Sequence, residues 1–487
     1  MIYPCCDEYL ELSKTYNLIP VYTEMVVDME TTVSIFKKVC HEDYTYMLES
    51  VEGGENLARY SFIGLEPMVI YRYENGCGIV EENGAQTKLT GGPLDILKLI
   101  MDRYQAPKIE GLPRFYGGAV GYFGYDVVRH LENLPKDTVK DLDLPDCNFV
   151  ITRLVLVFDH VRHKIKIVCN TQPGATPEAA YNDAVNRIRD VRNIIKAPAK
   201  TGRCQAKKCS SGEIDSNMSK QEFMNHVEKA KEYIRAGDVF QVVLSQRLKT
   251  PLRSDPFDIY RALRTINPAP YMYYLNFGET VIIGSSPEML VRVEDDQVQT
   301  CPIAGTRPRG LTAAEDETLG IELLADEKEK AEHIMLVDLG RNDLGKVCDY
   351  GSININGFME VQRYSHVMHI VSTVSGRLLP GKTVFDALKA CFPAGTVSGA
   401  PKIRAMEIVE ELEPVRRGVY AGAIGYFGFT GNMDTCITIR TILVHNGMTY
   451  VQAGAGIVAD SDPEREYQET INKAMALLET LTLEEVG

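Results

Sequence analysis

A nine-residue pattern occurs twice in this chain and limits the folds that it can adopt. YGGAVGYFG, residues 116–124, returns as YAGAIGYFG, residues 420–428. Small residues alternate with apolar ones in both copies, as in a buried strand that another element approaches closely. Two interpretations fit this echo: a duplicated sheet, or recurrence of a common strand pattern. Both predict a buried strand in each half of the chain.

The second half of the sequence alternates strand-like and helical segments. The strand-like runs are rich in Val, Ile and Tyr and comprise residues 240–250, 271–278, 280–290 and 297–306. Helical patterns cover residues 325–343 and 461–480, and Pro463 lies in the first turn of the second, where proline is favoured. This mixture predicts an α+β fold with large antiparallel or mixed sheets and helices on the outside.

Residues 197–218 form the clearest boundary along the chain. They are rich in Lys, Ser, Gly and Ala and show no apolar periodicity, which predicts a linker or an exposed loop. The sequence is therefore divided into residues 1–196, the linker 197–218 and residues 219–487. Ser219 and Glu222 have the spacing of a capping box, so a helix is expected to begin there.

Composition and charge argue against several classes of function. With 487 residues, 45% apolar and 24% charged, the chain has the balance of a folded globular protein. Its formal net charge of -15 disfavours nucleic acid and anionic membranes as partners, so an anionic substrate would need a local Arg or metal ion. The sequence shows no signal peptide, no apolar run of the ~20 residues that a membrane helix needs, and no metal-ligand spacing among its cysteines. We therefore expect a cytoplasmic protein with reduced thiols.

Two acidic doublets in helical segments are candidate metal ligands. Glu329 and Glu332 form one doublet, and Glu466 and Glu469 form the other. Residues three apart share a helix face, so each doublet presents two carboxylates in one direction. Four converging carboxylates would repel one another unless a hard cation lay among them, and oxygen ligands suit Mg²⁺. Taken alone, such doublets are more often solvated helix faces.

Two phosphate-binding patterns are present but incomplete. GRLLPGKT, residues 376–383, matches a P-loop letter for letter, yet its two leucines and Pro380 are unsuited to a nest of backbone N–H groups. GAGIVA, residues 454–459, resembles a dinucleotide fingerprint, but DSDP follows where the required helix should begin. Nucleotide binding at the P-loop pattern is a distant alternative, and close approach of a small anion to the second pattern is expected.

Nine segments in fixed order carry a resemblance to a known family. They are FQVVLSQR, SPEML, PIAGTRPRG, AEHIMLVDLGRND, HVMHIVSTVSG, FPAGTVSGAPKIRAMEI, YAGAIGYFG, DTCITIRT and QAGAGIVADSDPEREYQET. The chain resembles the chorismate-utilising enzymes, and among them the large component of anthranilate synthase, closely from Ser219 to about Thr480 and more loosely before. The resemblance implies a two-subdomain sandwich of sheets with helices outside. It also implies a lyase of tryptophan biosynthesis that converts chorismate to anthranilate.

The resemblance further implies which residues bind Mg²⁺ and chorismate. Glu332 and Glu469 would be the principal metal ligands, directly or through water, with Glu329 and Glu466 beside them. The remaining residues of the pocket would bind the pyruvyl carboxylate of chorismate or line its site: Arg440, Tyr420, Gly454, Ala455, Gly456, Gly305 and Thr306.

By the same resemblance, Glu288 would be the general acid that protonates the departing C4 hydroxyl, a role typically worth ~10²–10⁴ in rate. His369 would act in the later elimination of pyruvate, with Thr396 nearby. The sequence alone does not choose between His369 and His366. Capping of a turn by Glu288 and simple packing of His333 and His366 are the structural alternatives.

Two positions narrow the reaction that the resemblance implies. Relatives that add water to chorismate carry lysine at the position of Gln241, and glutamine cannot deprotonate water. Relatives that aminate C4 carry lysine at the position of Ala304, where an amine would capture C2 covalently. The two residues therefore favour direct addition of ammonia at C2. A 4-amino-4-deoxychorismate synthase component is the alternative.

Two further binding partners are expected, a protein subunit and an inhibitor. No cysteine lies in the setting of a glutaminase nucleophile, so ammonia is expected from a separate glutamine amidotransferase subunit in a hetero-oligomer. Feedback inhibition by L-tryptophan is expected at a pocket between the sheets that comprises Ser50, Pro270, Tyr271, Met272, Glu49, Arg59 and Tyr426. The alternative for residues 271–277 is an aromatic-rich strand in a core.

Overall fold

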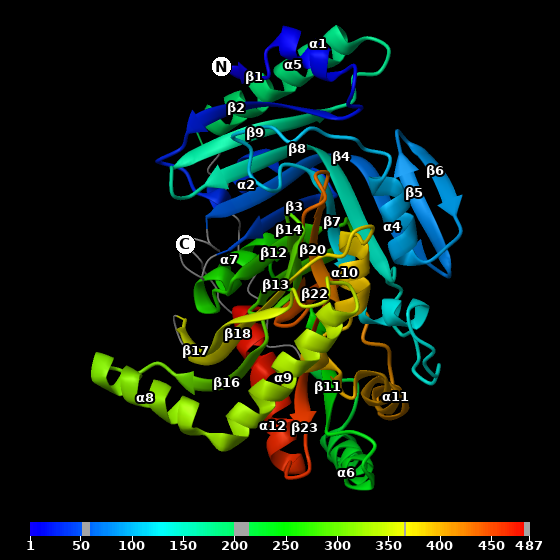
Figure 1. The fold of residues 1–487 in the computed structure, drawn as a ribbon, viewed down its shortest axis with the longest axis vertical. Coiled ribbons are helices and arrows are strands. Elements are labelled where there is room, and N and C mark those ends of the chain that lie inside the picture. Colours follow the sequence, from blue (N-terminus) through cyan, green and yellow to red (C-terminus); the bar gives the residue numbers. More distant parts are fainter. Residues whose placement is uncertain (51–58, 199–213, 365–366, 482–487) are drawn as a thin grey trace.

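The computed structural model describes residues 1–50, 59–198, 214–364 and 367–481 (Figure 1). The ladders between its named strands are antiparallel and helices lie outside them, so the predicted α+β fold is confirmed. The strands are β1 (Ile2–Tyr3), β2 (Ile19–Val26), β3 (Thr45–Glu49), β4 (Tyr60–Glu74), β5 (Cys77–Glu82), β6 (Ala85–Leu89), β7 (Gly118–Phe123), β8 (Cys147–Asp159), β9 (Lys164–Thr171), β10 (Asp215–Ser216), β11 (Gln241–Pro251), β12 (Tyr271–Asn276), β13 (Thr280–Ser286), β14 (Met289–Glu294), β15 (Gln297–Thr300), β16 (Ile303–Pro308), β17 (Asn354–Arg363), β18 (Val367–Arg377), β19 (Gly399–Ala400), β20 (Ala423–Gly428), β21 (Met433–Ile437), β22 (Thr441–His445) and β23 (Met448–Ile457).

The helices cover both ends of this sheet system. Near the N-terminus α1 and α5 lie over β2 and β9, and at the opposite end α6, α11 and α12 surround β11 and β23 (Figure 1). The helical elements are α1 (Cys6–Leu12), α2 (Thr32–Val39), α4 (Pro93–Met101), η1 (Tyr125–His130), α5 (Pro177–Lys196), α6 (Lys220–Ala236), α7 (Pro256–Ile266), α8 (Ala313–Ala325), α9 (Glu327–Gly345), α10 (Val384–Cys391), η2 (Gly395–Val397), α11 (Lys402–Leu412), α12 (Pro463–Leu478) and η3 (Glu479–Leu481).

Local sequence signals account for where several helices begin. The capping box predicted for α6 is present: Ser219 Oγ accepts from the Glu222 N–H, and the Glu222 carboxylate accepts from the Ser219 N–H. Gly237 ends this helix with φ +85°, a conformation that glycine adopts without strain. Asp462 caps α12, and Pro463 occupies its first turn as predicted.

The sheet forks at the paired strands β4 and β8. One series of paired strands, the first branch, runs β3–β12–β13–β22–β23–β11. The other, the second branch, runs β7–β20–β21–β14–β15–β18. Residues of both branches, from β3 and β12 in the first and from β20 and β21 in the second, line one cavity.

The two copies of the sequence echo are neighbouring strands in the second branch. β7 and β20 pair antiparallel and symmetrically about Gly121 and Gly425, which face each other. A Cβ at Gly121 would lie 2.0 Å from the Asn148 carbonyl oxygen, and one at Gly425 would lie 2.0 Å from the Asp434 carbonyl oxygen. Both positions therefore require glycine because adjacent backbone leaves no room for a side chain.

The predicted boundary at residues 197–218 divides the sequence but not the sheet. Strands β3 and β7 from residues 1–196 pair with β12 and β20 from residues 219–487. The largest apolar core likewise draws side chains from both regions, for example Phe149 and Phe427. Residues 199–213, which hold most of the boundary, lie outside the described residues.

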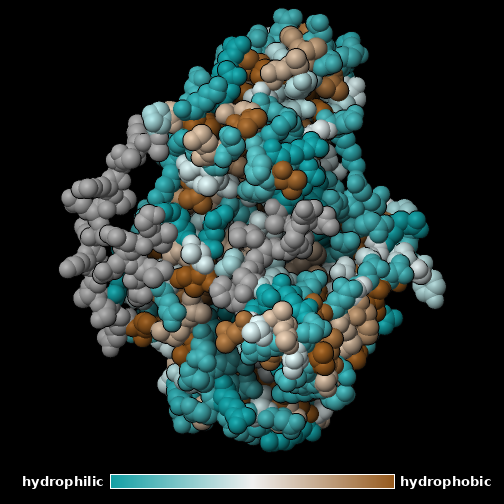
Figure 2. Space-filling model, turned by 90° about the vertical axis from the view of Figure 1, so that its left-hand side faces the viewer, coloured by the Kyte–Doolittle hydropathy of each residue, from teal (hydrophilic) through white to brown (hydrophobic). Residues whose placement is uncertain are grey.

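The surface agrees with the composition. Hydrophilic side chains dominate the face shown in Figure 2, with apolar ones scattered among them, and single apolar side chains on a surface are common. Within the described ranges, no helix is both long and apolar enough to cross a membrane. The ten described cysteines are all free thiols.

Candidate active site

Two short connections that cross between the branches carry predicted site residues. Glu288 lies in the link from β13 to β14, and Arg440 lies in the link from β21 to β22. Each link is hydrogen-bonded to the end of a strand beside the other link. The Ile437 N–H donates to the Glu288 carbonyl at 3.0 Å, and the Ser285 N–H donates to the Arg440 carbonyl at 3.1 Å. Backbone hydrogen bonds therefore fix each of the two links, the one with Glu288 and the one with Arg440, to the other's strand.

Glu288 has the properties of a proton donor. Glu288 is 9% exposed. Burial raises the pKa of its carboxyl to about 8, and the Thr396 hydroxyl lowers this pKa by a smaller amount. That hydroxyl faces Glu288 but makes no hydrogen bond of normal geometry with any described residue. A carboxyl with such a pKa is largely protonated near neutral pH, as a general acid must be.

A β-bulge aims the second predicted catalytic residue. The register of β16 against β18 shifts between Ala304 and Arg307, so Gly305 and Thr306 leave the regular ladder. His369 Nδ1 then lies 2.7 Å from the Gly305 carbonyl oxygen and 3.1 Å from Thr306 Oγ1. Bulges commonly re-aim side chains beside active sites, and here the displaced backbone orients an imidazole.

The hydrogen bond to Gly305 sets the tautomer of His369. A carbonyl can only accept, so Nδ1 carries the proton and Nε2 keeps its lone pair. Burial lowers the pKa of His369, which favours the neutral base. His333 is fully buried and bonds Ser372 Oγ at 2.7 Å, which fits the packing role considered for it. His366 lies outside the described residues.

Arg440 and Tyr420 form a cationic, strained part of the site. Arg440 has φ +52° and Ala421 has φ +62°, left-handed conformations that are uncommon for residues other than glycine. Strain of this kind gathers at functional sites. Burial lowers the pKa of Arg440, against the influence of Tyr420 and Glu469. Arg440 forms no ion pair with any described residue, so its charge is available to an anionic ligand.

The glycines of β23 make room for two polar side chains. A Cβ at Gly454 would lie 2.7 Å from the Tyr420 hydroxyl, and one at Gly456 would lie 2.4 Å from Gln241 Nε2. Ala455, between them, packs into the apolar core under α6 and α11. Because β22 stops pairing with β23 before this point, one edge of the strand has backbone groups free of a strand partner. The anion site expected at Gly454, Ala455 and Gly456 remains a prediction.

The four predicted carboxylates lie on α9 and α12, where they influence one another. Burial raises the pKa of Glu332, and the charges of Glu329 and Glu469 raise it further. Burial and the charge of Glu469 also raise the pKa of Glu466. Gln241 Nε2 donates to Glu332 Oε1 at 3.5 Å. Oxygen donors that repel one another suit a hard cation, although in the described part of the chain no three acidic, His or Cys side chains are grouped tightly enough to hold one.

Lys473 is a site residue that the sequence reasoning missed. Its Nζ lies 2.5 Å from Glu469 Oε1 and donates to the Gly454 carbonyl at 3.0 Å. It therefore links an acidic residue of α12 to the glycine edge of β23. The signal was available, because a Glu followed four residues later by Lys is the spacing of an intrahelical ion pair.

A cavity of about 80 Å³ lies between the branches, close to their fork. A single water needs roughly 10–15 Å³ on this measure, so the cavity can hold a larger molecule. Six of the seven predicted tryptophan-site residues line it: Glu49, Ser50, Pro270, Tyr271, Met272 and Tyr426. Further lining residues, not predicted from the sequence, include Leu48, Tyr60, Phe62, Arg114, Tyr273, Arg292, Ile424, Gly425, Asp434 and Cys436.

Arg59, the seventh predicted tryptophan-site residue, is not among the residues that line this cavity. Its side chain points to Asp159, with Nη2 2.9 Å from Oδ2. The cavity has other charged groups: Arg292 Nε donates to Asp434 Oδ2 at 2.8 Å, and the Tyr271 hydroxyl donates to Asp434 Oδ1 at 3.0 Å. No local motif indicated Arg292 or Asp434, because strand pairing alone brings them together.

Comparison with known proteins decides the family. A family model described as chorismate binding enzyme matches residues 47–479. The chain belongs to the chorismate-binding enzymes. Among curated members, it is 55% identical to anthranilate synthase component 1 of Acetivibrio thermocellus, over 100% of this chain and 99% of the relative. It is 48% identical to the Aquifex aeolicus protein of the same name, over 98% of each.

Solved structures of chorismate-binding enzymes share the fold. Anthranilate synthase component I from Streptococcus pneumoniae superposes with a TM-score of 0.78 at 39% identity, covering 93% of this chain and 98% of that one. The menaquinone-specific isochorismate synthase of Escherichia coli gives a TM-score of 0.73 at 19% identity, covering 98% and 99%, and supports the fold alone. The identities place this chain in the anthranilate synthase component 1 branch of the chorismate-binding enzymes.

Proposed function

We propose that the chain is the synthase component of anthranilate synthase, a Mg²⁺-dependent enzyme of tryptophan biosynthesis that converts chorismate and ammonia to anthranilate and pyruvate. One observation carries the proposal: the two links that join the branches carry a buried, protonatable Glu288 and an Arg440 that has no ion-pair partner among the described residues. The first suits a departing hydroxyl and the second suits a carboxylate, and chorismate has both groups. The names of the relatives support the same reaction.

In the first step, ammonia would form a bond to C2 of chorismate while the C4–O bond breaks. Glu288 donates its proton to the departing hydroxyl, which leaves as water. The nitrogen loses a proton, and the ring keeps two double bonds. Arg440 and Tyr420 would hold the pyruvyl carboxylate, so C4 stays within reach of Glu288 throughout.

In the second step, the C2–H bond and the ether bond to the pyruvyl group would break. His369 is suited to accept the C2 proton, because Nδ1 is committed to the Gly305 carbonyl and Nε2 retains its lone pair. The departing enol takes up a proton and becomes pyruvate. Loss of both groups leaves an aromatic ring, which is anthranilate.

Glu332 and Glu469 would hold Mg²⁺, with Glu329 and Glu466 nearby. The ion would supply positive charge for the ring carboxylate of chorismate and polarise it. Burial, and after it the charges of neighbouring carboxylates, raise the pKa values of Glu332 and Glu466, and an added cation would offset both effects, which supports this assignment. Lys473 partly offsets the charge of Glu469 from the side of β23.

Two buried residues favour amination at C2 over other chorismate reactions. Gln241 contacts Glu332, at the edge of the proposed metal site, and cannot act as a base toward water. Ala304 is buried beside the bulge and offers no amine for capture of C2, which disfavours 4-amino-4-deoxychorismate synthesis. We further propose that a glutamine amidotransferase subunit supplies ammonia, in keeping with the component name of the relatives.

The nucleotide-binding alternative has lost its structural basis. GRLLPGKT follows β18 of an antiparallel ladder and leads into α10. The Thr383 hydroxyl donates to Asp386 Oδ2 at 2.8 Å, so it serves the helix start. A P-loop requires that hydroxyl for a metal ion and follows a strand of a parallel sheet. These contacts favour a plain strand-to-helix turn.

The first test of the function uses the purified chain alone. With chorismate, ammonium and Mg²⁺, anthranilate fluorescence should rise, whereas glutamine in place of ammonium should give none. The reason is that burial raises the pKa of seven of the ten described cysteines, which disfavours the thiolate that a glutaminase nucleophile requires. An excess of chorismate without a nitrogen source is the control. Product other than anthranilate would overturn the proposed reaction, and glutamine-driven turnover would show an unrecognised glutaminase site.

We also propose that L-tryptophan inhibits by binding in the cavity between the branches. Tyr426 and Phe62, with ring centroids 6.2 Å apart, both line the cavity and supply an aromatic wall. Arg292 and Asp434 supply charges for an amino acid. A ligand that contacts both branches near the fork can change the angle between them. Glu288 and Arg440 lie in links that join the branches, so a change of angle alters their spacing.

Replacing Ser50 with phenylalanine should abolish inhibition by tryptophan and leave uninhibited activity nearly unchanged, because the larger side chain would fill the cavity. Activity against tryptophan concentration measures the effect, and coupling of about 1–3 kcal/mol is typical for such sites. Arg59→Ala is the matched control, since Arg59 does not line the cavity and its loss should leave inhibition intact. Full tryptophan sensitivity in Ser50→Phe would refute the assignment.

A further inference from the structure

A buried ion pair lies directly behind the proposed substrate-binding residues. Arg417 and Glu413 belong to the link between α11 and β20, and they are only 3% and 5% exposed. Arg417 Nε donates to Glu413 Oε2 at 2.9 Å, and Nη2 donates to Oε1 at 2.7 Å. This bidentate geometry fixes the plane and position of the guanidinium.

The same guanidinium holds two pieces of backbone that carry site residues. Nη1 of Arg417 donates to the Val397 carbonyl at 2.6 Å, and Nη2 donates to the Val243 carbonyl at 2.7 Å. Val397 follows Thr396 in η2, and Val243 lies two residues after Gln241 on β11. Because the donors of Arg lie in one rigid plane, the two segments cannot move independently while Arg417 bonds both.

The pair also contacts the proposed carboxylate site. The guanidinium carbon of Arg417 lies 5.7 Å from the centroid of the Tyr420 ring. Glu413 Oε1 accepts from the N–H and the hydroxyl of Ser245, each at 2.8 Å. Ser245 is paired with Gly454 across the β11–β23 ladder, and a Cβ at Gly454 would meet the Tyr420 hydroxyl. The Tyr420 hydroxyl lies in the space that the missing side chain of Gly454 leaves open. The ion pair thus contacts both the Tyr420 ring and Ser245, the strand partner of Gly454.

We infer that Arg417 and Glu413 are positioning residues, which set the Tyr420 hydroxyl and the η2 turn relative to the glycine edge of β23. The inference rests on the proposed function, because it takes Tyr420 to bind the pyruvyl carboxylate. Neither residue contacts the substrate itself, so both act through their neighbours. A buried ion pair is weak evidence for a role in stability. The hydrogen bonds of this pair go to backbone groups of Val397, Val243 and Ser245, which lie next to proposed site residues, and this favours a positioning role.

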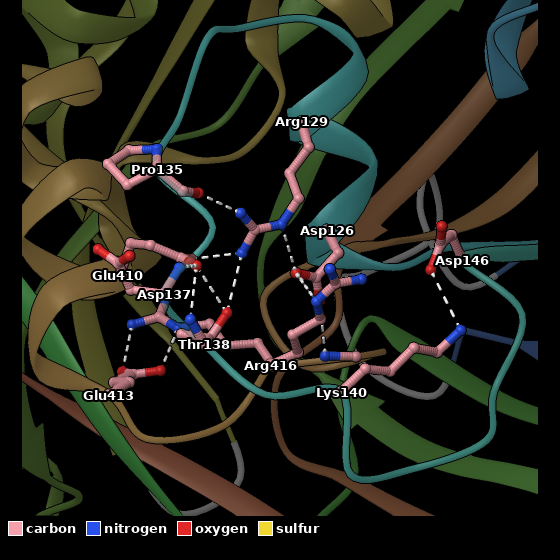
Figure 3. Close-up of polar contacts among 12 residues, drawn as sticks. Asp126, Arg129, Pro135, Asp137, Thr138, Lys140, Asp146, Glu410, Glu413 and Arg416 are labelled. Atoms are coloured by element: carbon pink, nitrogen blue, oxygen red, sulfur yellow. Dashed lines mark hydrogen bonds and ion pairs between the residues drawn. The ribbon is translucent and has the colours of Figure 1, made fainter. Parts of the chain in front are cut away.

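The chain contains a comparison pair close by, with Glu410 in the last turn of α11 and Arg129 in η1. Arg129 and Glu410 form another buried ion pair, and the Glu410 carboxylate also accepts from the Thr138 N–H at 2.9 Å (Figure 3). Arg129 Nε donates to Asp126 Oδ1 at 3.0 Å. Glu410 lies three residues before Glu413, but its bonds lead to residues 137–138 and not to the carboxylate site. Asp126 in turn accepts from the Gly418 N–H at 3.2 Å. Arg129→Lys therefore removes a buried ion pair that also reaches the backbone beside Arg417, but by a route that leaves the Arg417–Glu413 bonds in place.

The test measures kcat and KM for chorismate, with ammonium and Mg²⁺ in excess, together with Tm. The variants are Arg417→Lys and Arg129→Lys, each made alone and in a Tyr420→Phe background. Both single variants should lower Tm by similar amounts. Arg417→Lys should raise KM at least about 10-fold and kcat should fall less, whereas Arg129→Lys should change KM less than about twofold.

The double variants separate positioning from general damage. If Arg417 acts through the Tyr420 hydroxyl, Arg417→Lys should raise KM at least threefold less in the Tyr420→Phe background, whereas independent effects would multiply. Equal effects in both backgrounds, or an equal rise of KM in Arg129→Lys, would overturn the inference. Should Arg417→Lys fail to fold, Glu413→Gln keeps the side-chain shape and must show the same dependence on Tyr420. Absence of anthranilate from the unmodified chain would overturn the proposed function itself, a result distinct from these.

Discussion

Glu288→Gln is expected to slow anthranilate formation by about 10²–10⁴-fold while chorismate still binds, because the amide keeps the shape of the acid but has no proton to give. Anthranilate fluorescence measures turnover, and calorimetry measures chorismate binding. The acid must be protonated to act, and the pKa of Glu288 is raised to about 8 by burial. Activity of the unmodified enzyme should therefore fall as pH rises through about 8, and the residual activity of Glu288→Gln should lack this limb.

His369→Met is the comparison for this variant. It should leave ring amination in place and slow the elimination of pyruvate, so the aminated intermediate should be found by chromatography. Glu288→Gln should accumulate no intermediate and form product only at its residual rate, because the amination step itself is slowed. If Glu288→Gln retains wild-type turnover, or if its pH profile keeps the limb near 8, proton donation belongs to another group.

Glu332→Gln and Glu469→Gln should each reduce turnover by about 10²-fold or more, since a bound cation contributes several kcal/mol and each 1.36 kcal/mol is tenfold in rate. EDTA should produce the same loss in the unmodified enzyme, and added Mg²⁺ should reverse it. Titration of the chain with Mg²⁺ in a calorimeter gives a readout independent of turnover. Heat of binding should disappear in both variants.

Glu327→Gln is the matched control for the metal variants. Glu327 lies on the same helix as Glu332, but its side chain is 88% exposed and pairs with Lys330. Its loss should change neither Mg²⁺ binding nor turnover. Activity that survives EDTA undiminished would remove the metal from the mechanism.

The elements with strong local signals were predictable from the sequence. Capping at Ser219 and Asp462 and the position of Pro463 place helices α6 and α12 within a residue or two. The order of nine short segments carried the resemblance to the family, which comparison confirms, and that resemblance assigned the roles of Glu288 and His369, which stay predictions. These signals are local, so they are readable without knowledge of the strand order.

Contacts made by strand pairing were not predictable in the same way. Arg292 and Asp434 meet because β14 and β21 are neighbours, and nothing within either segment indicates the other. Arg59 was assigned to the tryptophan pocket by resemblance, but in the structure its side chain bonds Asp159 on β8 instead. A single sequence gives the residue types near a site, whereas their side-chain directions depend on register.

The pairing of β7 with β20 also bears on how the protein is made. Phe123 pairs with Ala423, which is 300 positions later in the chain (423 − 123). At a synthesis rate of about 5–20 residues per second, roughly 15–60 s separate the two strands on the ribosome. During that interval the edge of β7 has exposed N–H and C=O groups, which can pair with strands of other chains. We therefore expect the yield of folded protein in the cell to depend on translation speed and chaperone supply more than on the stability of the finished fold.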